Sequence, residues 1–119
     1  MELRQLETGD RYASLVLAGS LDMNSLALIE TRFFALTVGR GKHAVVDLSE
    51  LTFISSLGIG MLVTATKGLN RAGAKLVLFA PTENMAAVLA KAGLKEYLIV
   101  VANLDEARQL VETQCAITN

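Results

Sequence analysis

Residues 47–60 read Asp47-Leu-Ser-Glu-Leu-Thr-Phe-Ile-Ser-Ser-Leu-Gly-Ile-Gly60. This stretch overlaps a short apolar segment, residues 44–48, which is typical of a buried strand. The stretch then leads into an apolar helix that is predicted to begin near Leu57. Two adjacent serines, Ser55 and Ser56, stand at the junction. A hydroxyl group at a helix start can cap the helix or accept a phosphate, and the local residues leave both roles open.

Length and composition narrow the class of protein. The 119 residues fit one domain, and 52% apolar residues supply ample core. Eleven basic and twelve acidic residues are scattered along the chain, so we expect no direct nucleic-acid binding. The longest uncharged segment, residues 51–66, is shorter than the roughly 20 residues that span a bilayer, so we expect no membrane insertion. The lone Cys115 and the lack of a signal peptide favour a cytoplasmic location.

The N-terminal part of the chain predicts a β-hairpin followed by a helix. Residues 2–7 and 13–18 alternate loosely between polar and apolar types, as paired strands do. Apolar residues then recur three and four positions apart over residues 26–36, which indicates an amphipathic helix. Asn24 or Ser25 is the predicted N-cap of this helix.

Strand and helix signals alternate over the rest of the chain. The predicted elements are strands at residues 44–48, 75–80 and 98–101, and helices at 57–72, from Thr82 to Gly93, and after Asn103. Because strands joined through helices are normally parallel, an N-terminal hairpin followed by these units predicts an α/β fold with a mixed sheet. We expect the helices to pack mainly on one face of that sheet.

The residues near the serine pair have structural and functional interpretations. Gly58 and Gly60 each destabilise a helix by about 1 kcal/mol relative to alanine. Their presence is explained either by close packing of the helix on the sheet or by access for a partner. Asp22 and Asp47 stand near strand ends, where an isolated aspartate usually caps a turn. A cluster of both acids near the serines would instead help to steer a kinase.

Enzymatic sites fit the sequence poorly. His43 is the only histidine, and it precedes a strand at the end opposite Ser56, so a Ser-His-Asp arrangement lacks its base. Only two glycines of a dinucleotide-binding loop are present, and one cysteine with one histidine does not build a zinc site. We therefore expect no catalytic residue, no metal and no cofactor.

Two motifs in the chain resemble those of one family. Residues 17–22, Leu-Ala-Gly-Ser-Leu-Asp, are similar to a segment written L-x-G-x-L-D. Residues 47–60 are similar to a stretch written D-L-x-x-[LV]-x-F-[IM]-D-S-[ST]-G-[LI]-G. On these motifs the whole chain, residues 1–119, resembles a single STAS domain of the bacterial anti-sigma factor antagonists, also called anti-anti-sigma factors.

The resemblance implies a function in partner switching. Members of that family capture an anti-sigma factor that is also a serine kinase; the kinase phosphorylates the antagonist and ends the interaction until a serine phosphatase removes the phosphate. Carried over to this chain, the phosphate acceptor is Ser56. The implied partner-binding surface around it consists of Asp22, Ser55, Leu57, Gly58 and Gly60.

Two departures from the family pattern keep an alternative open. Ser55 stands where the family has an aspartate, and Leu57 stands where it has serine or threonine. Related STAS domains act without phosphorylation, as subunits of stressosome-like or lipid-transport ATPase complexes. The alternative function is therefore that of a non-phosphorylated interaction subunit. A small serine hydrolase is the third hypothesis for the function. The oligomeric state, including a weak homodimer, also remains open.

Overall fold

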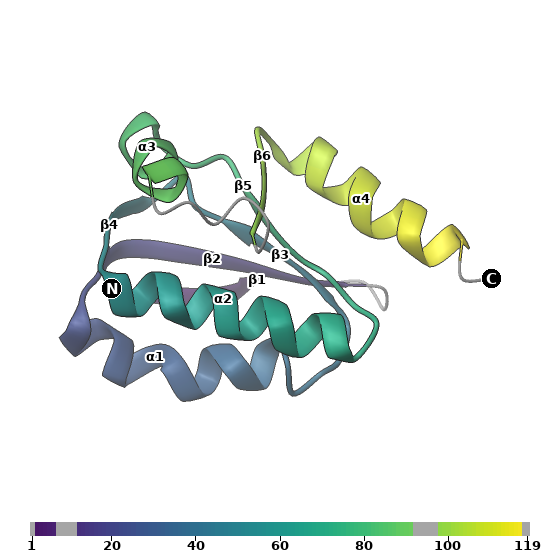
Figure 1. Cartoon of the computed structure of the whole chain (residues 1–119), viewed down its shortest axis with the longest axis horizontal. Helices are drawn as coiled ribbons and strands as arrows, with labels where there is room; N and C mark the ends of the chain where they lie inside the picture. Colours follow the sequence, from purple (N-terminus) through teal and green to yellow (C-terminus); the bar gives the residue numbers. More distant parts are fainter. Residues whose placement is uncertain (1, 7–11, 92–97, 118–119) are drawn as a thin grey trace.

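The computed structural model describes residues 2–6, 12–91 and 98–117, and within them six strands and four helices follow one another along the chain (Figure 1). In order they are β1 (Glu2–Leu6), β2 (Tyr12–Leu21), α1 (Met23–Leu36), β3 (His43–Asp47), β4 (Leu51–Ile54), α2 (Ser56–Arg71), β5 (Leu76–Phe79), α3 (Glu83–Lys91), β6 (Ile99–Val101) and α4 (Leu104–Ile117). None of the helices in this part of the chain has the length and apolar character needed to cross a bilayer.

The strands form one mixed sheet, as predicted. Its order is β1-β2-β3-β5-β6; β1 is antiparallel to β2, and the other neighbours are parallel. The predicted helix starts after β5 and β6 are also confirmed: Thr82 Oγ1 accepts a hydrogen bond from the Met85 N–H at 3.2 Å, and Asn103 Oδ1 accepts one from the Glu106 N–H at 2.9 Å. The predicted helix end at Gly93 lies outside the described residues.

The sequence prediction missed one strand. It placed a single strand before the helix, whereas β3 ends at Asp47 and a turn leads into the separate strand β4. β4 pairs in parallel with the last residues of β2, with Leu21 opposite Ile54. Only four residues make β4, and they stand in the uncharged stretch that continues into α2, so the sequence does not mark them off as a separate strand. Its pairing supplies partners for backbone groups at the end of β2, which would otherwise lack them.

Gly19 is the point at which β2 changes its pairing partner. Residues 12–16 of β2 pair with β3, and residues 19–21 pair with β4, with a shift of register between Gly19 and Ser20. Gly19 has φ 95°, a conformation that residues with a side chain rarely adopt, and its N–H donates to the Glu50 carbonyl at 2.9 Å. The glycine of the L-x-G-x-L-D segment is therefore needed to form this bulge.

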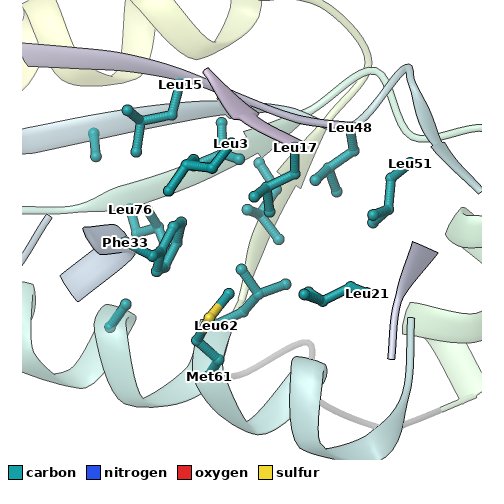
Figure 2. Close-up of a cluster of buried hydrophobic side chains, with 14 of the residues drawn as sticks. Leu3, Leu15, Leu17, Leu21, Phe33, Leu48, Leu51, Met61, Leu62 and Leu76 are labelled. Carbon is teal, nitrogen blue, oxygen red and sulfur yellow. The ribbon is translucent and has the colours of Figure 1, made fainter. Parts of the chain in front are cut away.

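The two faces of the sheet carry separate cores. Apolar side chains of α1, α2 and α3 pack on one face, and Figure 2 shows Met61 and Leu62 of α2 and Phe33 of α1 next to leucines of the sheet. α4 packs on the other face, where Ala107 and Val111 contact residues of β3 and β5. Three of the four described helices thus share one face, as expected, and α4 is the exception (Figure 1).

His43 joins the beginnings of β3 and β5. The side chain is buried, and its Nδ1 accepts a hydrogen bond from the Lys75 N–H at 2.9 Å. Burial, and then the positive charge of Lys75, lower the pKa of His43 below its ordinary value of 6.5. A protonated ring would carry a hydrogen on Nδ1 and lose this bond, so the folded state holds His43 neutral.

Acidification should therefore destabilise the fold through His43. Because its pKa is lowered in the folded state, the free energy of unfolding keeps its full value above pH 6.5 and falls as the pH drops from there toward the lowered pKa. Urea unfolding between about pH 7 and pH 5.5 measures this loss. His43→Asn keeps an acceptor for the Lys75 N–H and should flatten the pH dependence. An equally steep loss in this variant would contradict the assignment.

Candidate functional site

The helices α1 and α2 begin side by side at one corner of the sheet. The last residues of β2 and β4, Leu21 and Ile54, are paired, and the Ser55 N–H donates to the Leu21 carbonyl at 2.9 Å. Asp22 and Ser55 come directly after these strands, and each is the N-cap of the helix that follows. The pairing of β2 with β4 thus brings two helix N-termini, with their backbone N–H groups, to the same place.

Asp22 is the carboxylate at this corner. Its Oδ1 accepts a hydrogen bond from the Ser25 N–H at 2.9 Å, and its carbonyl accepts one from the Leu26 N–H at 2.9 Å. Hydrogen bonds from the backbone and side chain of Ser25 lower the pKa of Asp22, so the carboxylate is ionised at neutral pH. The prediction that Asn24 or Ser25 caps α1 is wrong, because the strand passes into the helix without an intervening loop.

The two serines have different environments. Ser55 is half-buried, and its Oγ accepts a hydrogen bond from the Gly58 N–H at 3.2 Å, which satisfies one free donor of the first turn of α2. Ser56 is the first helical residue and is exposed, and its hydroxyl makes no hydrogen bond within the described part of the chain. The cap is therefore Ser55, and the free hydroxyl is that of Ser56.

Alanine substitutions should separate these two roles. Ser55→Ala removes the cap of α2 and should lower the free energy of unfolding by about 1 kcal/mol. Ser56→Ala removes no bond and should change it by less than about 0.5 kcal/mol. Chemical denaturation of both variants tests the assignment, and Ser55→Asp, which keeps a favoured cap type, serves as the control. Equal losses for Ser55→Ala and Ser56→Ala would contradict it.

Gly58 and Gly60 serve different purposes. Gly58 is buried, and a Cβ atom there would lie 2.9 Å from side-chain atoms of Ile54 and of Leu21. It therefore lies beneath the surface, where it allows close packing of α2 on the sheet, and presents no face to a partner. Gly60 is exposed, with no atom within 4 Å of an added Cβ, so packing does not explain it.

Alanine at the two glycines should change stability in opposite directions. Gly58→Ala forces Leu21 and Ile54 apart, and overpacking of about 1–3 kcal/mol should exceed the gain in helix propensity. Gly60→Ala meets open space and should stabilise the protein by about 0.5–1 kcal/mol. Thermal or urea unfolding of both variants provides the comparison. A stabilised Gly58→Ala would show that the packing at this site relaxes freely.

Exposed apolar side chains stand at the starts of both helices. Leu57, which the sequence analysis placed at the helix start, is 54% exposed, and Met23, the first residue of α1, is 67% exposed. The sequence did not single out Met23, because its exposure at the helix start can be inferred only when Asp22 is known to be the N-cap of α1. We define the Ser56 corner as Asp22, Met23, Ser55, Ser56, Leu57 and Gly60.

Asp47 lies away from this corner. It stands beside Val16 of β2, five residues before Leu21, which places it roughly 16 Å back along the sheet. Its Oδ1 accepts a hydrogen bond from the Ser49 N–H at 2.8 Å and so stabilises the turn that leads into β4. The hypothesis of an Asp22–Asp47 cluster near the serines is therefore wrong, while the turn-capping role is confirmed.

His43 lies farther away still. It stands beside Tyr12, nine residues before Leu21 on β2, or roughly 30 Å from the corner. Ser56 therefore has no imidazole base within reach, which weakens the hydrolase reading. Among the residues that the structure covers, no group of three or more His, Cys, Asp or Glu side chains is placed to hold a metal ion.

The chain belongs to the STAS domain family, whose model matches residues 4–107. An anti-sigma-B factor antagonist from Listeria monocytogenes is 24% identical over 105 residues, which cover 88% of this chain and 90% of the relative. Among solved structures, a Thermotoga maritima candidate anti-sigma factor antagonist has a TM-score of 0.82 at 20% identity, covering 92% of this chain and 94% of that one.

A further similar protein has been solved in two states. The unphosphorylated form of the anti-sigma factor antagonist SpoIIAA has a TM-score of 0.76 at 18% identity, covering 94% of this chain and 97% of that one. The phosphorylated form, from Bacillus, has a TM-score of 0.67 at 20% identity, covering 92% and 99%. These likenesses bear out the STAS fold predicted from the sequence.

Proposed function

We propose that this chain is an anti-sigma factor antagonist that captures an anti-sigma factor with serine kinase activity. The kinase phosphorylates Ser56 and the complex separates; a serine phosphatase restores the binding form. The exposed hydroxyl of Ser56, left free because Ser55 caps α2, is the observation that carries the proposal. The names of similar proteins, including SpoIIAA in both phosphorylation states, support it. The proposed role is regulatory, cytoplasmic and non-enzymatic.

A phosphate on Ser56 is compatible with the fold. It adds about −1.5 to −2 charges beside the N-terminus of α2, where the helix dipole and free N–H groups stabilise negative charge. The first turn of α2 has no acidic residue that would oppose it. The modification therefore changes the surface of the corner and leaves the core beneath it intact.

The same phosphate would be costly in a complex. Met23 and Leu57 are exposed apolar side chains at the neighbouring starts of α1 and α2, and a partner that covers both helix starts also desolvates the Ser56 hydroxyl. A doubly charged phosphate in that position has a far larger desolvation cost. A partner that contacts this corner thus distinguishes the two states of Ser56.

Ser55 changes what the kinase encounters. An aspartate in its place would put a negative charge next to the acceptor, whereas serine caps α2 without charge. We infer that the cognate kinase recognises Ser56 through the apolar neighbour Leu57 and through Asp22, and that it does not require an acid at position 55.

Substitutions at Ser56 should reproduce the two states. Ser56→Ala should bind the anti-sigma kinase as tightly as the native protein, and Ser56→Asp should bind at least about tenfold more weakly. Calorimetry measures the affinities, and intact mass after incubation with ATP and the kinase should show one phosphate on the native protein and none on Ser56→Ala.

Thr64→Asp provides the matched control, because Thr64 is exposed on α2 two turns after Ser56. Its affinity should stay near the native value. If Ser56→Asp binds as tightly as Ser56→Ala, the switch is excluded. A constitutive interaction subunit, as in stressosome-like or lipid-transport ATPase complexes, then becomes the better description.

A further inference from the structure

Basic residues gather at the end of the sheet opposite the Ser56 corner. Arg40 and Lys42 lie in the loop between α1 and β3, Arg71 is the last residue of α2, and Lys75 directly precedes β5. The first three side chains are exposed and that of Lys75 is half-buried. We call these four residues the basic end.

Packing contacts bring these residues together although up to 35 positions separate them in the sequence. The loop after α1 lies against the last turns of α2: an added Cβ at Gly68 would lie 2.7 Å from Val38, and one at Gly41 would lie 3.9 Å from the Cβ of Ala72. Lys75 is held next to His43, and so next to Lys42, by its backbone bond to the His43 ring.

Within the described residues, no acidic side chain of the loop after α1, of α2 or of β5 offsets this charge. The chain has no aspartate or glutamate in residues 31–46 or 51–82, which include the loop, all of α2 and all of β5. The four basic side chains form no ion pair with the described residues. Arg4, by contrast, pairs with Glu2 and Glu50 on the other half of the sheet. The segments that lead into β2 and β6, residues 7–11 and 92–97, together carry three acids and two basic residues and lie outside the described residues.

Helix stability explains only part of this arrangement. Arg71 stands in the last turn of α2, where a positive charge complements the helix dipole. Lys42 and Lys75 lie outside the helices and have no such role. Among the described residues, the fold therefore leaves four basic side chains at this end without an acidic partner.

We propose that the basic end docks the domain on an anionic lipid bilayer. A headgroup layer attracts exposed lysine and arginine side chains through charge alone and requires no pocket, and each such residue strengthens binding about fivefold. Four residues give a weak, reversible and salt-sensitive association. The Ser56 corner then points away from the bilayer and remains open to its partner.

Other occupants fit this end less well. A protein interface needs apolar anchors at its centre, but the most exposed large apolar side chains of the described residues, Leu28 and Met23, lie in the first half of α1, toward the Ser56 corner. At the basic end, Val38 is 37% exposed. A second copy would need an apolar centre as well as carboxylates, so the same lack of exposed anchors disfavours it. A nucleic-acid backbone would be attracted by the same charges, and the duplex-DNA arm of the test below separates it from the bilayer.

Vesicle flotation tests the proposal with the full chain. At low salt the native protein should float with vesicles of phosphatidylglycerol and phosphatidylcholine, should not float with phosphatidylcholine alone, and should be released at high salt. Lys42→Gln should weaken binding about fivefold and the double variant Lys42→Gln/Arg71→Gln about 25-fold. Lys91→Gln, at an exposed lysine ending α3, is the matched control and should bind as the native protein does.

Three results would overturn the proposal. The first is no flotation with anionic vesicles at low salt while circular dichroism shows a native fold. The second is an equal loss in Lys42→Gln and Lys91→Gln, which would mean that the site is elsewhere. The third is salt-sensitive self-association in sedimentation, or binding to duplex DNA, that Lys42→Gln weakens while vesicle binding is unchanged. Ser56→Asp should leave flotation unchanged, so failure here is distinct from failure of the switch.

Discussion

The divided pairing of β2 determines the positions of most other parts of the molecule. Its first half pairs with β3 and its last residues pair with β4, and the positive φ of Gly19 allows the change between them. This bulge lets β4 end beside the end of β2, so that α1 and α2 start at one corner. The pairing of Leu21 with Ile54 and the hydrogen bond from the Ser55 N–H to the Leu21 carbonyl hold Ser55 beside Asp22. The geometry of the corner thus depends on the conformation of one glycine near the end of a strand.

The corner combines a rigid support with an exposed surface. Beneath it, Gly58 packs on Leu21 and Ile54, and Ser55 satisfies a donor of the first turn of α2. Above it, Ser56 and Leu57 have few contacts with the rest of the fold. Because the supporting residues and the exposed residues are different, the proposed phosphate on Ser56 would alter the surface and leave the core beneath it unchanged. This separation suits a switch that acts through binding.

The two ends of the sheet differ in charge because its strands are mostly parallel. β3 and β5 are each preceded by basic residues and followed by acidic ones. Because the two strands are parallel, their first residues lie at one end of the sheet and their last residues at the other. Helix dipoles favour the same distribution, since acids stabilise helix starts and bases stabilise helix ends. Among the described residues, charges that look scattered along the chain are therefore grouped in space, and four basic side chains lie together in a chain of net charge −1.

The sequence by itself determined the order of most elements, the mixed sheet, the caps at Thr82 and Asn103 and the serine pair, because periodicity and capping are local properties. It did not reveal β4, the cap role of Asp22, the exposure of Met23 or the distance of Asp47. Each of these depends on which strands pair and in what register, and pairing is decided by packing between distant segments. For the same reason only the tertiary structure separated the capping Ser55 from the free Ser56 and gathered the basic residues at one end.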